Sequence, residues 1–152
     1  MTSRERVLAA LSHREPDLVP VDFAGTDCSS IHVVGYQRLR QQLGFATRPV
    51  RLGCLTQQVA EADPEVQDRL GADAVALHFH PRRWRRWDEG YGIPLEVPER
   101  WRPEHEADGG WVIRDAAGKP RYRQAAGGLY FDAVGFPLAG VTAPDELAAH
   151  AE

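Results

Sequence analysis

The chain has 152 residues, and its size and composition exclude several classes of protein. Charged residues make up 26% of the sequence and hydrophobic residues 43%, as in an ordinary globular domain. The formal net charge of −4 gives no reason to expect nucleic acid or an anionic membrane as a partner. The two cysteines, Cys28 and Cys54, do not have the spacing of a paired motif, so we expect no disulfide framework.

The N-terminal region and the chain length set two further limits. The sequence is charged from Arg4 onward and has no apolar signal core, and no apolar run approaches the length that spans a membrane. We therefore expect a cytoplasmic protein without a membrane partner. A complete eight-stranded α/β barrel needs about 250 residues, so a full barrel does not fit in this chain.

The first predicted elements are a capped helix and a buried strand. Thr2 and Glu5 have the spacing of a capping box, and Pro16 ends the helix that follows them. The apolar residues of Val19–Phe23 predict a short buried strand, since a proline is tolerated near the start of a strand.

Two more helices and a second strand follow along the chain. A helix is predicted over Tyr36–Leu43, with Gly44 in the usual stop position. The next helix is capped by Asp63 and ends at Gly71, and Ala74–Phe79 then predicts a second buried strand. The alternation of helix, glycine and apolar strand is typical of a parallel sheet with helical crossovers.

The composition changes after Pro81, where the chain becomes rich in Pro, Gly, Trp and Arg. Trp111–Arg114 and Arg121–Arg123 flank a glycine-containing loop and predict a β-hairpin. Leu129–Phe131 predicts another short strand, and Thr142 is the first residue of a predicted helix.

We therefore expect one domain over residues 1–152 with three parts. Residues 1–80 hold the first βα units, and 81–141 form an excursion of β-hairpin and loops. Residues 142–152 are the start of a helix that the end of the chain truncates.

Five stretches together carry a family resemblance, through their order and spacing: Arg4–Leu11, Glu15–Val21, Arg69–Asp73, Gly127–Asp132 and Phe136–Leu138. With them the chain resembles the N-terminal portion of the uroporphyrinogen decarboxylase-like superfamily, near the branch of uncharacterised members and corrinoid-linked methyltransferases. The resemblance implies an α/β fold, namely the N-terminal part of an incomplete TIM-type (β/α) barrel with a β-hairpin insertion.

The same resemblance implies part of a methyltransferase that uses zinc and a corrinoid to move a methyl group to a thiol or similar acceptor. The relatives hold zinc through His and Cys residues of a C-terminal half that is missing here. We therefore expect that this chain alone binds neither cofactor and is not catalytic alone. The expected partner is the missing barrel half or a second copy of the chain.

Two alternatives to the methyltransferase interpretation remain open. The chain is then either a truncated or split relative that acts as a non-catalytic interaction piece, or a tetrapyrrole decarboxylase. The decarboxylase ranks last because those enzymes grip substrate carboxylates with an arginine-containing segment after the first strand. The corresponding residues here, 24–30, contain no arginine.

Two acidic residues are candidate substrate contacts. Asp22 lies near the C-terminal end of the predicted first strand, on the barrel face where active sites are built, and Asp27 follows in the next loop. The alternative for Asp22 is that its carboxylate caps a neighbouring amide of the loop.

Arg82 and Arg83 open a run of arginines and tryptophans that ends at Trp87. Guanidinium and indole groups together bind phosphates, carboxylates or single-stranded nucleic acid, although the acidic chain argues against nucleic acid. We predict that Arg82 and Arg83 contact an anionic substrate. The alternative is an exposed loop whose tryptophans cover the edge of the fold while its arginines stay in water.

His78 and His80 alternate on the predicted second strand, so both side chains point to one face. Zinc would need a third protein ligand, and Cys28 or Cys54 supplies one only if the fold brings it near. A lone His-x-His is more often a packing or solvent-contact feature, and we predict no metal site.

Overall fold

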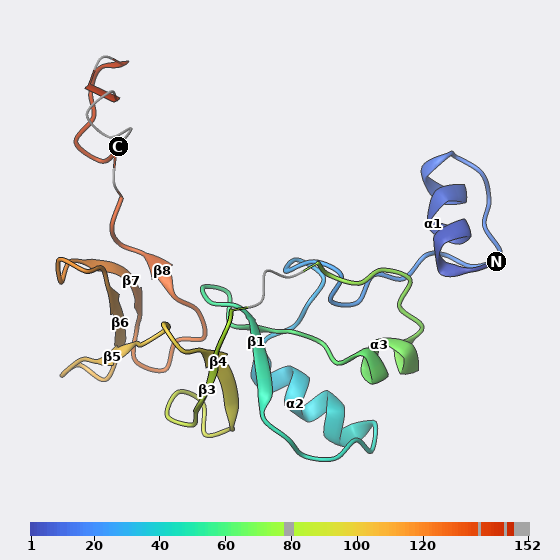
Figure 1. The fold of residues 1–152 in the computed structure, drawn as a ribbon, viewed down its shortest axis with the longest axis horizontal. Coiled ribbons are helices and arrows are strands. Elements are labelled where there is room, and N and C mark those ends of the chain that lie inside the picture. The colour runs from blue at the N-terminus through green and yellow to red at the C-terminus, as the bar shows by residue number, and fades with distance from the viewer. Residues whose placement is uncertain (78–80, 137, 145, 148–152) are drawn as a thin grey trace. The chain divides into compact units, whose positions relative to one another are not determined.

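A computed structural model describes residues 1–77, 81–136, 138–144 and 146–147, and the chain divides into two compact units. The first unit is Met1–Trp101 and the second is Arg102–Glu152. In the sequence the division falls after Trp101, C-terminal to the change of composition at Pro81. Figure 1 labels the helices and strands.

The described residues form three helices, whose ends differ in part from those expected. They are α1 (Ser3–Leu11), α2 (Val33–Gln42) and α3 (Pro64–Leu70). The first ends at Leu11, well before Pro16, and the second begins at Val33 rather than at Tyr36. At the start of the third, the Asp63 side chain makes no capping hydrogen bond. The predicted capping box of α1 is confirmed, because the Glu5 amide donates to the Thr2 hydroxyl and the Thr2 amide donates to the Glu5 carboxylate.

The first unit contains a four-stranded sheet in the order β2-β1-β4-β3 (Figure 1). Its strands are β1 (Val50–Cys54), β2 (Val59–Ala60), β3 (Trp84–Trp87) and β4 (Leu95–Pro98). β1 runs parallel to β4, whereas the β1–β2 and β3–β4 pairs are antiparallel. β3 and β4 thus form a hairpin on one side of β1.

The core of the first unit lies between this sheet and α2, which packs on β1. Alternate residues of the two central strands are buried, Leu52 on β1 and Leu95 and Val97 on β4. Val33 and Tyr36 of α2 are equally buried. Each large aliphatic side chain removed from water in this way stabilises the unit by about 1.5–3 kcal/mol.

The second unit is an antiparallel sheet whose four strands follow in chain order. They are β5 (Glu104–His105), β6 (Trp111–Arg114), β7 (Pro120–Gln124) and β8 (Asp132–Ala133). The β6–β7 pair confirms the predicted hairpin. The strand predicted over Leu129–Phe131 is wrong, because the pairing with β7 begins at Asp132.

The predicted α/β fold, an incomplete TIM-type barrel, is also wrong. The described residues form two mostly antiparallel sheets and no barrel. Val19–Phe23 and the described part of Ala74–Phe79 form no strand, and Val19 and Leu77 are 82% and 98% exposed. An apolar run becomes a buried strand only where a neighbouring strand satisfies its backbone groups, and here none does within the described residues.

The last predicted helix, over 142–152, falls partly on residues 145 and 148–152, which lie outside the described residues. At its start, the Glu146 carboxylate accepts a hydrogen bond from the Thr142 amide at 2.8 Å. This interaction, followed by one from the Ala143 amide, lowers the pKa of Glu146 below its usual value.

Candidate functional site

Three arginines gather at the open end of the β3–β4 hairpin, opposite its turn. Arg82 and Arg83 precede β3, and Arg100 follows β4. The Glu99 amide donates to the Arg83 carbonyl at 3.0 Å, which continues the ladder beyond the strands and holds the two ends of the hairpin together. Arg100 is not predicted from the sequence, because only the pairing of β3 with β4 brings it beside Arg82 and Arg83.

These side chains border a hollow of about 670 Å³, which we name the arginine hollow. It is lined by Pro81, Arg82, Arg83, Pro98, Glu99 and Arg100. The lining carries three guanidinium groups against one carboxylate, an excess of two positive charges. An excess of this sign in a concave surface attracts anions.

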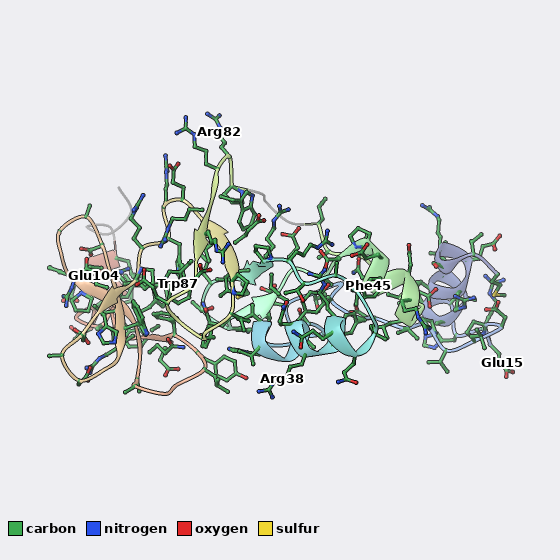
Figure 2. All side chains as sticks on the ribbon, turned by 90° about the horizontal axis from the view of Figure 1, so that it is seen from below. Glu15, Arg38, Phe45, Arg82, Trp87 and Glu104 are labelled. Carbon is green, nitrogen blue, oxygen red and sulfur yellow. The ribbon has the colours of Figure 1, made fainter. Side chains whose placement is uncertain are left out.

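The guanidinium groups of the arginine hollow are open to solvent. Arg83 is 78% exposed in its side chain, and its Nη1 lies 3.9 Å from Glu99 Oε2, which makes a loose surface pair of little energetic weight. Within the described part of the chain, the side chains of Arg82 and Arg100 have no hydrogen-bond or ion-pair partner. Figure 2 shows the Arg82 side chain pointing away from the hairpin ribbon.

The later residues of the same basic run have partners close by in the first unit. Arg85 donates to the Trp101 carbonyl, with Nη2 at 2.9 Å, and Arg86 pairs with Asp88 at 2.7 Å. Trp87 is buried and meets the Trp101 ring edge-on, with 4.7 Å between ring centroids. The run therefore divides, because Arg85 and Trp87 are tied to Trp101 whereas Arg82 and Arg83 line the arginine hollow.

The two predicted acidic contacts lie in a loop away from the lining of the arginine hollow. Asp22 is exposed, and its Oδ1 accepts a hydrogen bond from the Gly25 amide at 2.8 Å, which is the loop-capping role given as its alternative. Asp27 is exposed in the same loop. Because the predicted first strand does not form, neither residue stands at a strand end.

Among the described residues, no group of three or more His, Cys, Asp and Glu side chains is arranged to hold a metal ion. His78 and His80 lie outside the described residues. Cys28 is exposed, whereas Cys54 is partly buried with its Sγ 3.5 Å from the Thr56 hydroxyl.

A second feature of the first unit is a set of exposed aliphatic side chains, which we name the apolar strip. Its members are Leu18, Val19, Val21, Val75 and Leu77, and all are exposed. They lie on two segments without regular secondary structure, 18–23 and 72–77, which adjoin (Figure 1) where the Asp73 amide donates to the Val21 carbonyl at 2.7 Å. The strip coincides with the two strands expected from the sequence, and no strand of the described chain covers it.

Two further findings concern membrane-spanning helices and similarity to known proteins. In the part of the chain that the structure describes, no helix is both long and apolar enough to cross a bilayer. Comparison with protein-family models, curated proteins and solved structures finds no match to this chain.

Proposed function

We propose that this chain is an interaction module whose apolar strip binds another polypeptide. The support is the exposure of large aliphatic side chains on adjoining segments, among them Val19, Val75 and Leu77. Single exposed apolar residues are ordinary on a protein surface, but a contiguous set marks a contact surface. Covering each such side chain stabilises a complex by about 1.5–3 kcal/mol before the costs of association.

The occupant we propose is an extended, strand-forming apolar segment of the partner. Val19 and Val21 are two residues apart, as are Val75 and Leu77, so each pair faces one side of its extended segment. An extended backbone that lacks a neighbouring strand is a template for strand addition. A partner strand added beside either segment would bury these aliphatic side chains.

The two segments of the apolar strip are held in place by a single carboxylate. Asp73 accepts hydrogen bonds from the Val21 amide at 3.0 Å and from Arg6 at 2.5 Å. The strip is thus presented by a fixed scaffold, which lowers the ordering cost of binding.

Light scattering of the purified chain over a range of concentrations tests this proposal. Without its partner, the chain is expected to self-associate through the apolar strip, and the double variant Val19→Thr, Leu77→Thr is expected to shift it toward monomer. The control is Phe136→Ser, which removes an exposed apolar residue of the second unit. A chain that stays monomeric and unfolds cooperatively at all concentrations contradicts the proposal. So does a control variant that shifts the chain toward monomer as much as the double variant does.

A second proposal is the methyl-transfer role, in which this chain is one part of a protein that uses zinc and a corrinoid. Its support is the order and spacing of the sequence stretches that carry the family resemblance. On this proposal a partner polypeptide holds the metal. Zinc and corrinoid measured in the purified chain test it: zinc at one equivalent would overturn this division of roles and point to His78 and His80.

A further inference from the structure

We propose that the arginine hollow binds a phosphate group. This site is separate from the apolar strip, because no residue of the strip lines it. The phosphate-binding proposal can therefore be tested independently of the proposed interaction module.

The excess positive charge of the hollow favours the binding of an anion. Three arginines line the hollow at the open end of the β3–β4 hairpin, two before β3 and one after β4, and Glu99 offsets one of their charges at most. Like charges held near one another repel, and a bound anion relieves that repulsion. The guanidinium fork donates two parallel hydrogen bonds to an oxyanion, so such groups favour phosphate and carboxylate over halide ions.

The number of guanidinium groups favours phosphate over carboxylate. One carboxylate has a single negative charge and is satisfied by one guanidinium fork. A phosphate group on a monoester carries about −1.5 to −2 charges at neutral pH and three acceptor oxygens, which matches both the excess charge and the three donors of the hollow. The remaining lining residues are Pro81, Pro98 and Glu99.

The ends of the hairpin are held in position before any ligand binds. The Trp101 amide donates to the Pro98 carbonyl at 2.9 Å, and the Trp101 carbonyl accepts from Arg85. These bonds flank Arg100 and fix the backbone from which it extends. A site preorganised in this way loses less entropy on binding than one on a free loop.

Isothermal titration of the whole chain at low ionic strength tests the site, with inorganic phosphate and pyrophosphate as probes. Arg100→Gln and Arg82→Gln are each expected to weaken pyrophosphate binding by about tenfold or more, because each removes a charge-assisted hydrogen bond. Both side chains project into solvent, so the fold is expected to survive, which a thermal melt checks.

The matched control is Arg38→Gln, which removes the same charge from an exposed arginine of α2 outside the hollow. Equal weakening by the control would mean that only net charge matters and would overturn the proposal. So would an absence of pyrophosphate binding, or tighter binding of malonate than of pyrophosphate.

A short single-stranded oligonucleotide distinguishes the source of the phosphate. With a chain of net charge −4, free phosphate compounds are expected to bind more tightly than the oligonucleotide. Tighter oligonucleotide binding that Arg100→Gln abolishes would support the phosphate chemistry and assign it to a nucleic-acid backbone.

Discussion

Arg6 of α1 pairs with Asp73, just beyond α3, with 2.5 Å between Nη1 and Oδ1. The Asp73 side chain is only 2% exposed, and its second oxygen accepts from the Val21 amide at 3.0 Å. One carboxylate therefore connects α1 with both segments of the apolar strip. The Val21 amide, followed by Ser3 and Arg6, lowers the pKa of Asp73 below its usual value.

This connection predicts an acid-sensitive contribution to stability. Because the folded-state pKa of Asp73 lies below the unfolded value of about 3.9, its contribution is complete above that pH and is lost as the pH falls through the folded value. Asp73→Asn is expected to lower the melting temperature at neutral pH, and the difference from the unaltered chain is expected to shrink below about pH 4.

Thermal melts followed by circular dichroism between neutral and acidic pH measure this difference. Asp27→Asn, which changes an exposed carboxylate of the nearby loop, serves as the control and is expected to have no effect. A melting-temperature difference for Asp73→Asn that is independent of pH would contradict the role of the ionised carboxylate.

Gly90 in the β3–β4 turn is expected to tolerate no side chain. A Cβ at this position would overlap the indole ring of Trp87. The ring is buried and packed edge-on against Trp101, so it has no room to move away. Gly90→Ala is expected to lower the free energy of unfolding by about 1–3 kcal/mol through overpacking.

Gly35→Ala is the matched control for this substitution. Gly35 lies in α2, where a Cβ would meet only Ile31 Cδ1 at an ordinary 3.8 Å. Alanine there is expected to raise the free energy of unfolding by about 0.5–1 kcal/mol, since glycine is the poorer helix former. Urea titrations followed by tryptophan fluorescence compare the two, and changes of the same sign would refute the packing argument.

Tyr36 and Asp63 form a buried polar contact between α2 and the start of α3. The Tyr36 hydroxyl donates to Asp63 Oδ2 at 3.0 Å and accepts from the Asp63 amide at 2.6 Å. Burial, the largest influence, raises the pKa of Tyr36, which is 1% exposed, so the phenol stays neutral. Tyr36→Phe is expected to cost about 1–3 kcal/mol of unfolding free energy, because it leaves the Asp63 amide without its acceptor.

The corresponding control is Tyr122→Phe in β7, which removes an exposed hydroxyl of the second unit. Chemical denaturation is expected to separate the two variants clearly. If both change the unfolding midpoint by the same amount, the Tyr36 hydroxyl has no special structural role.

The two cysteines are expected to differ in their rate of alkylation. Cys28 is exposed, whereas Cys54 is partly buried on β1 beside Thr56. Iodoacetamide under native conditions is expected to label Cys28 first, and Cys28→Ser is expected to remove the fast phase in mass spectrometry. Faster labelling of Cys54 would show that β1 opens readily.

The helices and one hairpin follow from short stretches of sequence. The capping box of Thr2 and Glu5 and the left-handed C-cap of Gly71 act within a single turn of chain. The β6–β7 hairpin closes through a loop of a few residues with Gly118 at positive φ. Such interactions depend on near neighbours, so their residue pattern is enough to predict them.

The first sheet could not be predicted in the same way. β1 pairs with β4, and the contact between Arg51 and Glu96 spans 45 residues of sequence. Conversely, Val19–Phe23 has the composition of a buried strand but finds no strand partner within the described chain. Composition records how readily a segment becomes a strand, but the hydrogen bonds that make it one come from elsewhere in the chain.

The candidate binding site could likewise be predicted only in part. Arg82 and Arg83 are visible in the sequence because they open a basic and aromatic run. Their joining with Arg100 into one hollow is decided by the pairing of β3 with β4, and so is the burial of Trp87. The sequence by itself determined which charged groups exist, how α1 begins and where α3 ends, because these depend on side-chain type and local hydrogen bonds. Only the tertiary structure decided which of those groups converge, because convergence requires backbone pairing between segments that are distant in the chain.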